Sequence, residues 1–195
     1  LMFVSFFLPS GAAKAGWTNY SPLATTTDLH YGDLFWTGQT QWLMGMVFLI
    51  SSSLLGAVNF ICTIINLRCR GMTWMRMPFF VWAMLVTGFL LLLAFPPLEV
   101  AALMQLMDRL AGTSFFIPTG LNVSGMSFDA AGGGSPLLYQ HLFWFLAHPE
   151  VYVLILPALA IVSEVIPCNT RKPLWGYKTM VYAVMVLGFL AFIVW

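Results

Sequence analysis

Long apolar stretches without charge, separated by short polar segments, are the main pattern of this chain. No charged residue lies between Asp33 and Arg68, or between Arg76 and Glu99, and two further apolar stretches follow. A membrane-crossing helix needs roughly 20 apolar residues, so stretches of this kind are typical of membrane spans. The pattern predicts spans at about 35–66, 78–107, 135–166 and 176–195, with residues 1–9 as the tail of an earlier span.

The composition supports the same interpretation. Hydrophobic residues make up 60% of the chain and charged residues 8%, and the mean hydropathy is +0.87. Because soluble domains have about 25% charged residues, we expect an all-α, polytopic transmembrane helix bundle surrounded by membrane lipids. There is no internal repeat or separate soluble domain, so residues 1–195 are interpreted as one bundle fragment, cut at both ends. The net charge of +1 does not indicate a partner, and no basic cluster offers a nucleic-acid surface, so no nucleic-acid partner is expected.

Basic residues predict the orientation of the spans. The only lysine and arginine residues in the loops at about 10–34 and 109–134 are Lys14 and Arg109. The two other loops are rich in these basic residues. Basic loops stay on the cytoplasmic or matrix side of a membrane, so the two basic loops are expected there and the others outside. The basic residues are Arg68, Arg70, Arg76, Arg171, Lys172 and Lys178.

The third span contains ionisable residues near its middle, in the run from His148 to Tyr152. The hydrocarbon core penalises a charged side chain by roughly 2.5 kcal/mol or more, so we interpret these residues as a functional site. At about 100° per residue, His148 and Tyr152 lie one turn apart on one face, and Glu150 lies on the other side of the helix. The same stripe as His148 includes His141, Trp144 and Ser163.

The residues alone leave several alternatives open. A lone intramembrane histidine can hydrogen-bond between helices instead of binding a metal, and aromatic stripes are usually packing. Neutral imidazole is nevertheless the commonest metal ligand, and in a membrane interior it favours copper or iron over hard cations. A carboxyl group at the depth of Glu150 either stays protonated or takes part in proton transfer. Pro149 and Pro157 each remove a backbone hydrogen bond, so an irregular helix is expected here.

The sequence of the third span closely resembles a known family. Residues 138–157, LYQHLFWFLAHPEVYVLILP, resemble the sixth membrane helix of subunit I of the haem-copper oxidases, the catalytic subunit of cytochrome c oxidase. The resemblance implies a fragment from roughly the end of helix III to helix VII of a twelve-helix subunit. It extends to GWTNYSPL (16–23), SSLLGAVNFICTIIN (52–66), FVWAMLVTGFLLLLAFP (80–96), DRLAGTSFF (108–116), AGGGSPLLYQH (131–141) and GFLAFIVW (188–195).

This resemblance implies a respiratory terminal oxidase, in which dioxygen is reduced to water at a haem and copper centre and the reaction is coupled to proton pumping. It implies an active-site copper and two haems as cofactors, and oxidase subunits of types II and III as partners. Cytochrome c is the implied electron donor. The implied location is the bacterial cytoplasmic membrane or the mitochondrial inner membrane.

The resemblance also implies roles for single residues of this chain. His148 matches a copper ligand, and Tyr152 matches the tyrosine that is covalently joined to that histidine in the family. Glu150 matches the glutamate that divides protons between the reaction site and the pump. The other matches are the proton-pathway residues Ser52, Ser53 and Asn59 below Glu150, Ser163 at the entry of a second proton path, Trp144 at the copper and haem site, and Trp17 near the haem propionates. Interhelical hydrogen bonding is an alternative for Ser52, Ser53 and Asn59, and interfacial anchoring is an alternative for Trp17.

The chain departs from the family pattern at some positions. Glu164 stands where familiar members often have histidine, and residues 117–127 are an insertion before Phe128 and Asp129. The chain has one copper ligand of three and no haem ligand, so alone it is expected to be inactive. Alternatives are a quinol oxidase or a nitric oxide reductase of the same superfamily, although Tyr152 argues against the reductase, and a non-catalytic membrane remnant.

Overall fold

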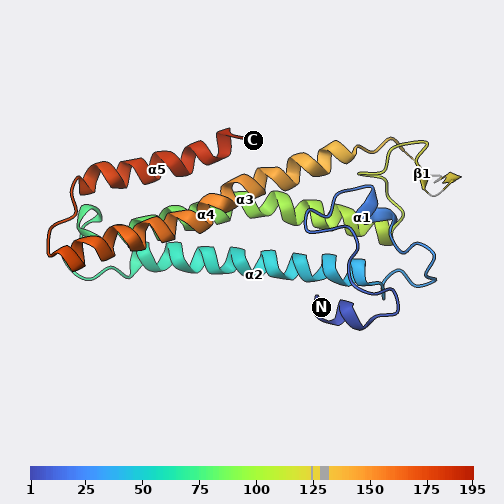
Figure 1. Ribbon diagram of the computed structural model, residues 1–195, viewed down its shortest axis with the longest axis horizontal. Coiled ribbons are helices and arrows are strands. Elements are labelled where there is room, and N and C mark those ends of the chain that lie inside the picture. The colour runs from blue at the N-terminus through green and yellow to red at the C-terminus, as the bar shows by residue number, and fades with distance from the viewer. Residues whose placement is uncertain (124, 128–131) are drawn as a thin grey trace. The chain divides into compact units, whose positions relative to one another are not determined.

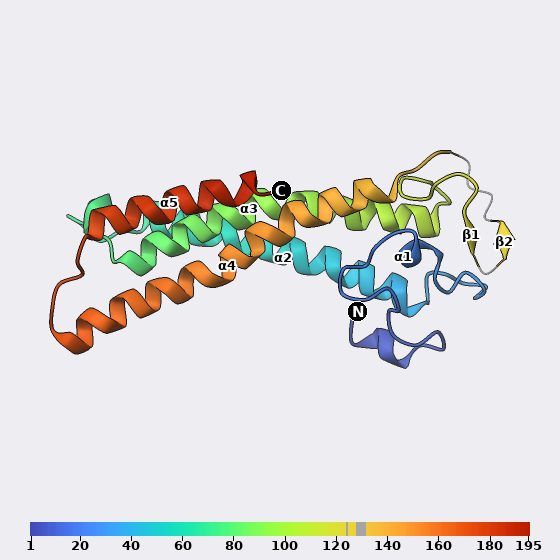
Figure 2. The ribbon, with the colours of Figure 1, turned by 45° about the horizontal axis from the view of Figure 1, so that its top comes forward.

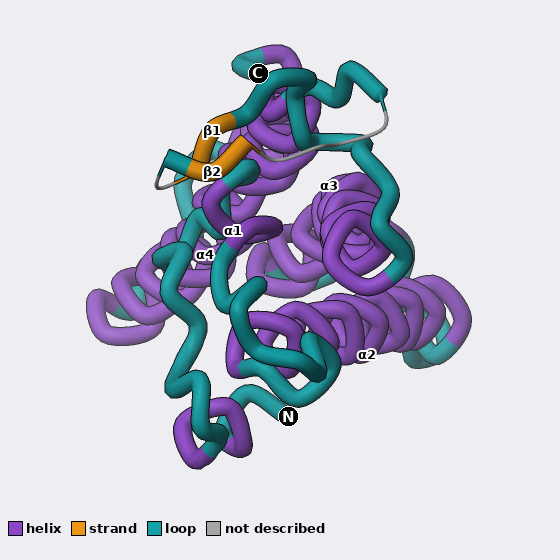
Figure 3. The backbone as a smooth tube through the Cα atoms, turned by 90° about the vertical axis from the view of Figure 1, so that its right-hand side faces the viewer, coloured by secondary structure: helices purple, strands orange, loops and turns teal. Residues whose placement is uncertain are grey.

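Helices make up most of the computed structural model, which describes residues 1–123, 125–127 and 132–195 (Figure 3). The long helices are α2 (Gly38–Asn66), α3 (Phe79–Leu110), α4 (Pro136–Thr170) and α5 (Tyr177–Ile193). The short elements are the helix α1 (Leu23–Thr26), two 3-10 helices (Val4–Phe7 and Trp74–Arg76) and an antiparallel hairpin of β1 (Asn122–Val123) and β2 (Met126–Ser127).

Three of these helices, α2, α3 and α4, are long and apolar enough to cross a membrane, and α5 is a shorter apolar helix. The prediction of an all-α, polytopic membrane helix bundle is confirmed by this helical architecture. The helix ends differ from the expected spans: α2 begins at Gly38 instead of near residue 35, and α4 continues to Thr170.

Polar contacts explain why α2 begins late. The Asp33 carboxylate accepts a hydrogen bond from the backbone N–H of Phe35, at 3.0 Å, and the Gln41 side chain donates to the carbonyl oxygen of Phe35. These contacts hold residue 35 in a turn. Thr37 then precedes the helix, and its carbonyl oxygen accepts the backbone N–H of Gln41 as the first turn of α2 forms.

Helix α4 is continuous over 35 residues although it contains Pro149, Pro157 and Pro167. We expected an irregular helix here, because a proline inside a helix lacks the N–H that would bond the carbonyl oxygen four residues earlier. The affected carbonyl oxygens are those of Phe145, Val153 and Ser163. In α4 the missing backbone bonds therefore leave acceptors without a helical donor, but they do not interrupt the helix.

The chain divides into two compact units. Unit 1 consists of residues 1–51 and 97–144, and unit 2 consists of residues 52–96 and 145–195. The helices α2, α3 and α4 each contribute one part to each unit. The two units are described separately below.

Arg109, at the end of α3, organises the loop structure of unit 1. Its buried guanidinium group donates hydrogen bonds to the carbonyl oxygens of Ala24, Thr25 and Thr27, and to the hydroxyl groups of Thr37 and Thr40. In this way α3 holds both the segment around α1 and the start of α2. A buried arginine whose donors are satisfied by backbone carbonyls and threonine hydroxyls fixes a loop firmly, because each lost bond would leave a buried group unpaired.

A second set of polar contacts in unit 1 joins the N-terminal segment to the helices. Asn19, which has a positive φ, donates from its side chain to Gln105 of α3 and accepts a short hydrogen bond from Gln39 of α2. Lys14 and the buried Asp28 form an ion pair at 2.7 Å, and this hydrogen bond raises the pKa of Lys14. The N-terminal segment is therefore fixed by buried polar groups as well as by apolar packing.

Unit 2 has a hydrophobic core built mainly by α3, α4 and α5, and α2 contributes Ile61 to it. Helix α5 runs alongside the first half of α3 (Figures 1 and 2). Trp82 in this core donates from its indole N–H to the carbonyl oxygen of Trp74. The Tyr177 hydroxyl donates to the carbonyl oxygen of Met77. The buried members are Ile61, Met77, Phe79, Trp82, Ala83, Leu85, Leu90, Leu156, Ala160, Val181, Val184 and Ala191.

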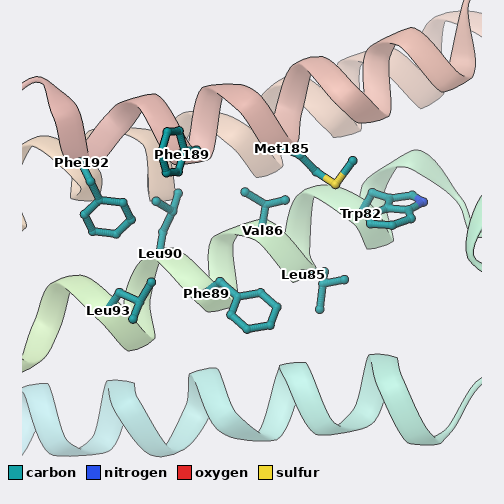
Figure 4. A pocket seen from close by; sticks show the side chains of 10 residues that line it. Trp82, Leu85, Val86, Phe89, Leu90, Leu93, Met185, Phe189 and Phe192 are labelled. Carbon is teal, nitrogen blue, oxygen red and sulfur yellow. The ribbon is translucent and has the colours of Figure 1, made fainter.

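An apolar pocket of about 430 Å³ lies between α3 and α5 in this unit (Figure 4). Val86 and Leu90 of α3 and Met185 and Phe192 of α5 line it, and Figure 4 shows Met185 and Phe192 directed toward α3. Gly188 keeps the two helices close, because a Cβ atom at that position would lie 2.6 Å from a methyl carbon of Val86.

Candidate functional site

His148 and Tyr152 form a ring pair on α4 within unit 2. Their ring centroids are 4.9 Å apart, with an angle of 67° between the ring planes, which is an edge-to-face arrangement. The spacing of four residues along a helix produces this proximity. The structure thus brings together the two residues that the sequence placed on one stripe.

The Nε2 atom of His148 is buried and has no hydrogen-bond partner within residues 1–123, 125–127 and 132–195. Buried polar atoms are nearly always bonded, so an orphaned imidazole nitrogen indicates a partner from outside the described residues. A metal ion is a chemically suitable partner, because neutral imidazole binds copper and iron well. The described part of the chain has no group of three or more His, Cys, Asp or Glu residues that could hold a metal, so His148 would be one ligand among others.

Glu150 lies between these two residues in sequence but on another face of α4. Its side chain is exposed, and the ion pair Lys14–Asp28 is the one salt bridge among the described residues, so Glu150 has no cationic partner there. A carboxyl group on an apolar helix without a nearby cation favours its neutral form.

The predicted pathway residues occupy α2 and the end of α4 in unit 2. Ser52 and Asn59 are exposed and Ser53 is half-buried, all in the part of α2 that belongs to this unit. Ser163 donates to the carbonyl oxygen of Leu159 at 2.7 Å. It lies eleven residues beyond Tyr152, or about 16 Å along the helix, so the structure does not bring these two hydroxyl groups together.

Ser163 lines three pockets at the end of α4. One of about 330 Å³ continues along Leu156 and Leu159, one of about 320 Å³ includes Glu164 and Tyr177, and a third of about 320 Å³ includes Thr170 and Trp175. Glu164, which departs from the family pattern, accepts a hydrogen bond from the backbone N–H of Phe80 at 2.9 Å. A carboxylate at the start of α3 stabilises that helix end, so here Glu164 acts as a cap supplied by another helix.

Trp17 and Trp144 lie in unit 1 and contact each other. Their ring centroids are 6.3 Å apart, nearly perpendicular, and the Trp144 indole N–H donates to the hydroxyl of Tyr20. Sequence reasoning missed the rest of this aromatic cluster, although the spacing of four residues between Tyr139 and Phe143 could have indicated it. Tyr20, Tyr139 and Phe143 pack around the two tryptophans.

The inserted segment 117–127 is described in part. It includes the hairpin of β1 and β2, whereas Ser124 and the residues after the insertion, Phe128 and Asp129, lie outside the described residues.

The fold and the site define an integral membrane protein, a polytopic helix bundle with ionisable residues on an apolar helix. The profile of the family described as Cytochrome C and Quinol oxidase polypeptide I matches residues 1–195. The chain belongs to this family, and thus to the haem-copper oxidases.

Several curated relatives match nearly the whole chain. It is 45% identical over 191 residues to the alternative cytochrome c oxidase subunit 1 of Bradyrhizobium diazoefficiens, which covers 98% of this chain and 32% of that relative. It is 44% identical over 191 residues to cytochrome c oxidase subunit 1 of Bacillus sp. strain PS3, covering 98% of this chain and 28% of that relative. To cytochrome c oxidase subunit 1 of Synechocystis sp. the chain is 43% identical over 195 residues. This match covers 100% of this chain and 32% of that relative. The chain spans about a third of the length of these relatives.

Proposed function

We propose that this chain is part of the catalytic subunit of a respiratory terminal oxidase, which reduces dioxygen to water and couples the reaction to proton pumping. The observation that carries the proposal is the pair of His148 and Tyr152 on α4, with a buried and unpaired Nε2 on the histidine. Family membership over the whole chain supplies the reaction class.

His148 would hold the active-site copper through Nε2, together with ligands from the rest of the subunit. The copper and the haem, when bound, supply the electrons that dioxygen accepts. The contribution of this chain is to fix one imidazole in place. Helix α4 does so by packing: Leu146, Ala147 and Pro149, next to His148, are buried.

Tyr152 would supply one electron and one proton to dioxygen, and it would be joined to His148. A bond between the two rings removes one hydrogen atom from each residue, and the two electrons pass to an oxidant, which dioxygen would supply. The edge-to-face contact at 4.9 Å supports such a bond because the residues are already neighbours before any reaction.

Glu150 would receive protons and pass them either to the reaction site or to the pump. Its position on a different face from His148 supports a relay role. The carboxyl group can contact water on one side of α4, while His148 would bind the metal on the other side. Ser52, Ser53 and Asn59 would hold the water chain that reloads Glu150 from the basic side of the membrane. Ser163, which lines three pockets, would admit protons to a second path toward Tyr152.

Trp144 and Trp17 would pack at the edge of the haem site, within the aromatic cluster of unit 1. Two haems, with iron ligands outside this chain, subunits of types II and III, and cytochrome c as donor complete the proposed assembly. We propose the bacterial cytoplasmic membrane or the mitochondrial inner membrane as its location. A quinol oxidase remains the alternative, because the family description includes quinol oxidases.

An optical spectrum of the native complex tests the proposal. A terminal oxidase is expected to show high-spin haem bands that shift when carbon monoxide binds. Absence of haem would identify a non-catalytic remnant and overturn the proposal. Oxygen consumption with reduced cytochrome c or with quinol then distinguishes the two donors.

Replacing Tyr152 with Phe tests the role of the phenol. We expect the Tyr152→Phe protein to keep its metals and to lose turnover. In the unmodified enzyme, peptide mass spectra should show His148 and Tyr152 as one linked species, two hydrogen atoms lighter than the separate peptides. Two unlinked residues in active enzyme would contradict the linkage.

A further inference from the structure

A polar contact joins two apolar helices well inside the length of each helix in unit 1. The Oγ atom of Ser51 on α2 lies 2.6 Å from Oε1 of Glu99 on α3, and 3.0 Å from the carbonyl oxygen of Val47. Ser51 is about 20 Å from the start of α2 and Glu99 about 16 Å from the end of α3, at 1.5 Å per residue. The function proposed above uses neither residue.

The number of available protons distinguishes the two states of Glu99. A serine hydroxyl has one proton, so it can donate to one acceptor. If Glu99 is ionised, its carboxylate and the Val47 carbonyl oxygen are both acceptors. The single hydroxyl proton of Ser51 can serve only one of them, and the other then faces a lone pair of the Ser51 oxygen at hydrogen-bonding distance. If Glu99 is protonated, it donates to Ser51, and Ser51 donates to Val47. The observed pair of distances is fully satisfied in the protonated state.

The charges around Glu99 agree with this assignment. Helix α2 has no Asp, Glu, Lys, Arg or His residue. The other ionisable residues of α3 are Asp108, which accepts from Thr113 and from the backbone of Phe115, and Arg109, which is bound to the loops. The remaining described ionisable side chains of unit 1 are Lys14, Tyr20, Asp28, His30, Tyr31, Asp33, Tyr139 and His141, and the salt bridge among the described residues joins Lys14 to Asp28.

An unpaired carboxylate at this depth is costly, and the neutral acid avoids that cost. We propose that Ser51 and Glu99 form a proton-binding site inside the membrane, separate from Glu150, in which Glu99 holds the proton. Release of the proton turns the Ser51 hydroxyl from Val47 toward Glu99, so that the new carboxylate gains a donor. The hydroxyl thus has a defined partner in both states, and α2 and α3 stay in contact.

Infrared spectroscopy of the native membrane protein that carries this chain tests the site directly. At neutral pH we expect a band of a protonated carboxyl group that shifts in heavy water and disappears in the Glu99→Gln variant. The same band should remain in Glu150→Gln, which shows that the two carboxyl groups are different. Absence of any band difference between the native protein and Glu99→Gln would overturn the proposal.

The variant Ser51→Ala provides an independent measurement. Loss of the hydroxyl removes the acceptor of the Glu99 proton, so the carboxyl band should move to higher frequency without disappearing. Thr63→Ala, which removes an exposed hydroxyl from the same helix, is the matched control and should leave the band unshifted. An unshifted band in Ser51→Ala, or an equal shift in Thr63→Ala, would contradict the pairing even if Glu99→Gln fails to fold.

Discussion

The proposed copper site on α4 depends on a single nitrogen atom. His148 Nε2 is buried without a partner among the described residues, whereas most buried polar atoms of unit 1 are paired within the chain. Leaving such a group unpaired costs about 1–3 kcal/mol, and a bound metal ion would give the nitrogen a partner.

Replacing His148 with Ala should remove the copper and leave the haems bound, because the proposed role of the imidazole is to hold the copper alone. Metal analysis and the haem spectrum of the purified complex measure both quantities. His30→Ala, which changes an exposed loop histidine, is the control and should retain full copper. Full copper content with normal oxygen consumption in His148→Ala would refute the assignment.

Glu150→Gln keeps the shape of the side chain but cannot release a proton. We expect it to block the proton-requiring steps of oxygen reduction and to abolish pumping, with nearly unchanged haem and copper spectra. Proton release from reconstituted vesicles is the measurement, and Asp33→Asn in an exposed loop is the control. A Glu150→Gln enzyme that pumps at the normal ratio would leave Glu150 as a structural carboxyl group.

Residue patterns within α4 were sufficient to place His148, Glu150 and Tyr152, because helical periodicity is local and two positions four residues apart must be neighbours. The roles of these residues came from the family resemblance and stay predictions. The unpaired Nε2 could not be inferred from sequence, since it depends on everything that surrounds the ring.

At the scale of elements, glycines on α2 show how closely the N-terminal segment approaches. A Cβ atom on Gly38 would lie 1.8 Å from the backbone carbonyl oxygen of Gly11, whereas a Cβ atom on Gly56 would meet nothing within 4 Å. The first glycine permits a backbone contact, and the second has no such neighbour.

Gly38→Ala and Gly56→Ala should therefore change stability in opposite directions. Gly38→Ala must displace the segment at Gly11 and is expected to destabilise by about 1–3 kcal/mol or more. Gly56→Ala lies at a half-buried position inside a helix, where the added Cβ meets no atom within 4 Å, and should stabilise by about 0.5–1 kcal/mol. Thermal unfolding of the detergent-solubilised protein compares the two variants. Equal effects would show that the approach of Gly11 does not constrain α2.

Apolar length indicated which segments are helical, and the confirmed all-α fold agrees. The exact ends of the helices were harder to predict from sequence, because they depend on side-chain contacts such as those of Asp33 and Gln41 with Phe35. Contacts of this kind are specified by three-dimensional proximity and have no periodic signal.

At the scale of the whole molecule, the orientation in the membrane is open to experiment. Cys69 lies in the basic loop after α2 and is exposed, and the positive-inside rule predicts that this loop faces the cytoplasmic or matrix side. A cysteine introduced by Gly32→Cys would lie in a weakly charged loop on the outer side, where an added Cβ meets no atom within 4 Å.

A membrane-impermeant thiol reagent should label the Gly32→Cys position in right-side-out vesicles and Cys69 in inverted vesicles. Cys62, within α2, should react with neither preparation, because hydrocarbon covers it. Labelling of Cys69 in sealed right-side-out vesicles would reverse the assigned orientation.

Long-range polar contacts in unit 1 were beyond sequence reasoning. Arg109 binds residues more than 60 positions away, and nothing in the spacing of Ala24, Thr25 and Thr27 indicates an arginine partner. The pair of Ser51 and Glu99 was missed for the same reason, since each residue alone resembles an ordinary polar residue in a span.

The three prolines of α4 have a mechanical consequence. Proline in a helix interior is about 3 kcal/mol less favourable than alanine, yet α4 has one at 149, 157 and 167. Where the backbone bond is already absent in the resting helix, bending at that point breaks nothing further. Helix α4 therefore has three points, the first directly after His148, at which it can bend without breaking a further backbone hydrogen bond.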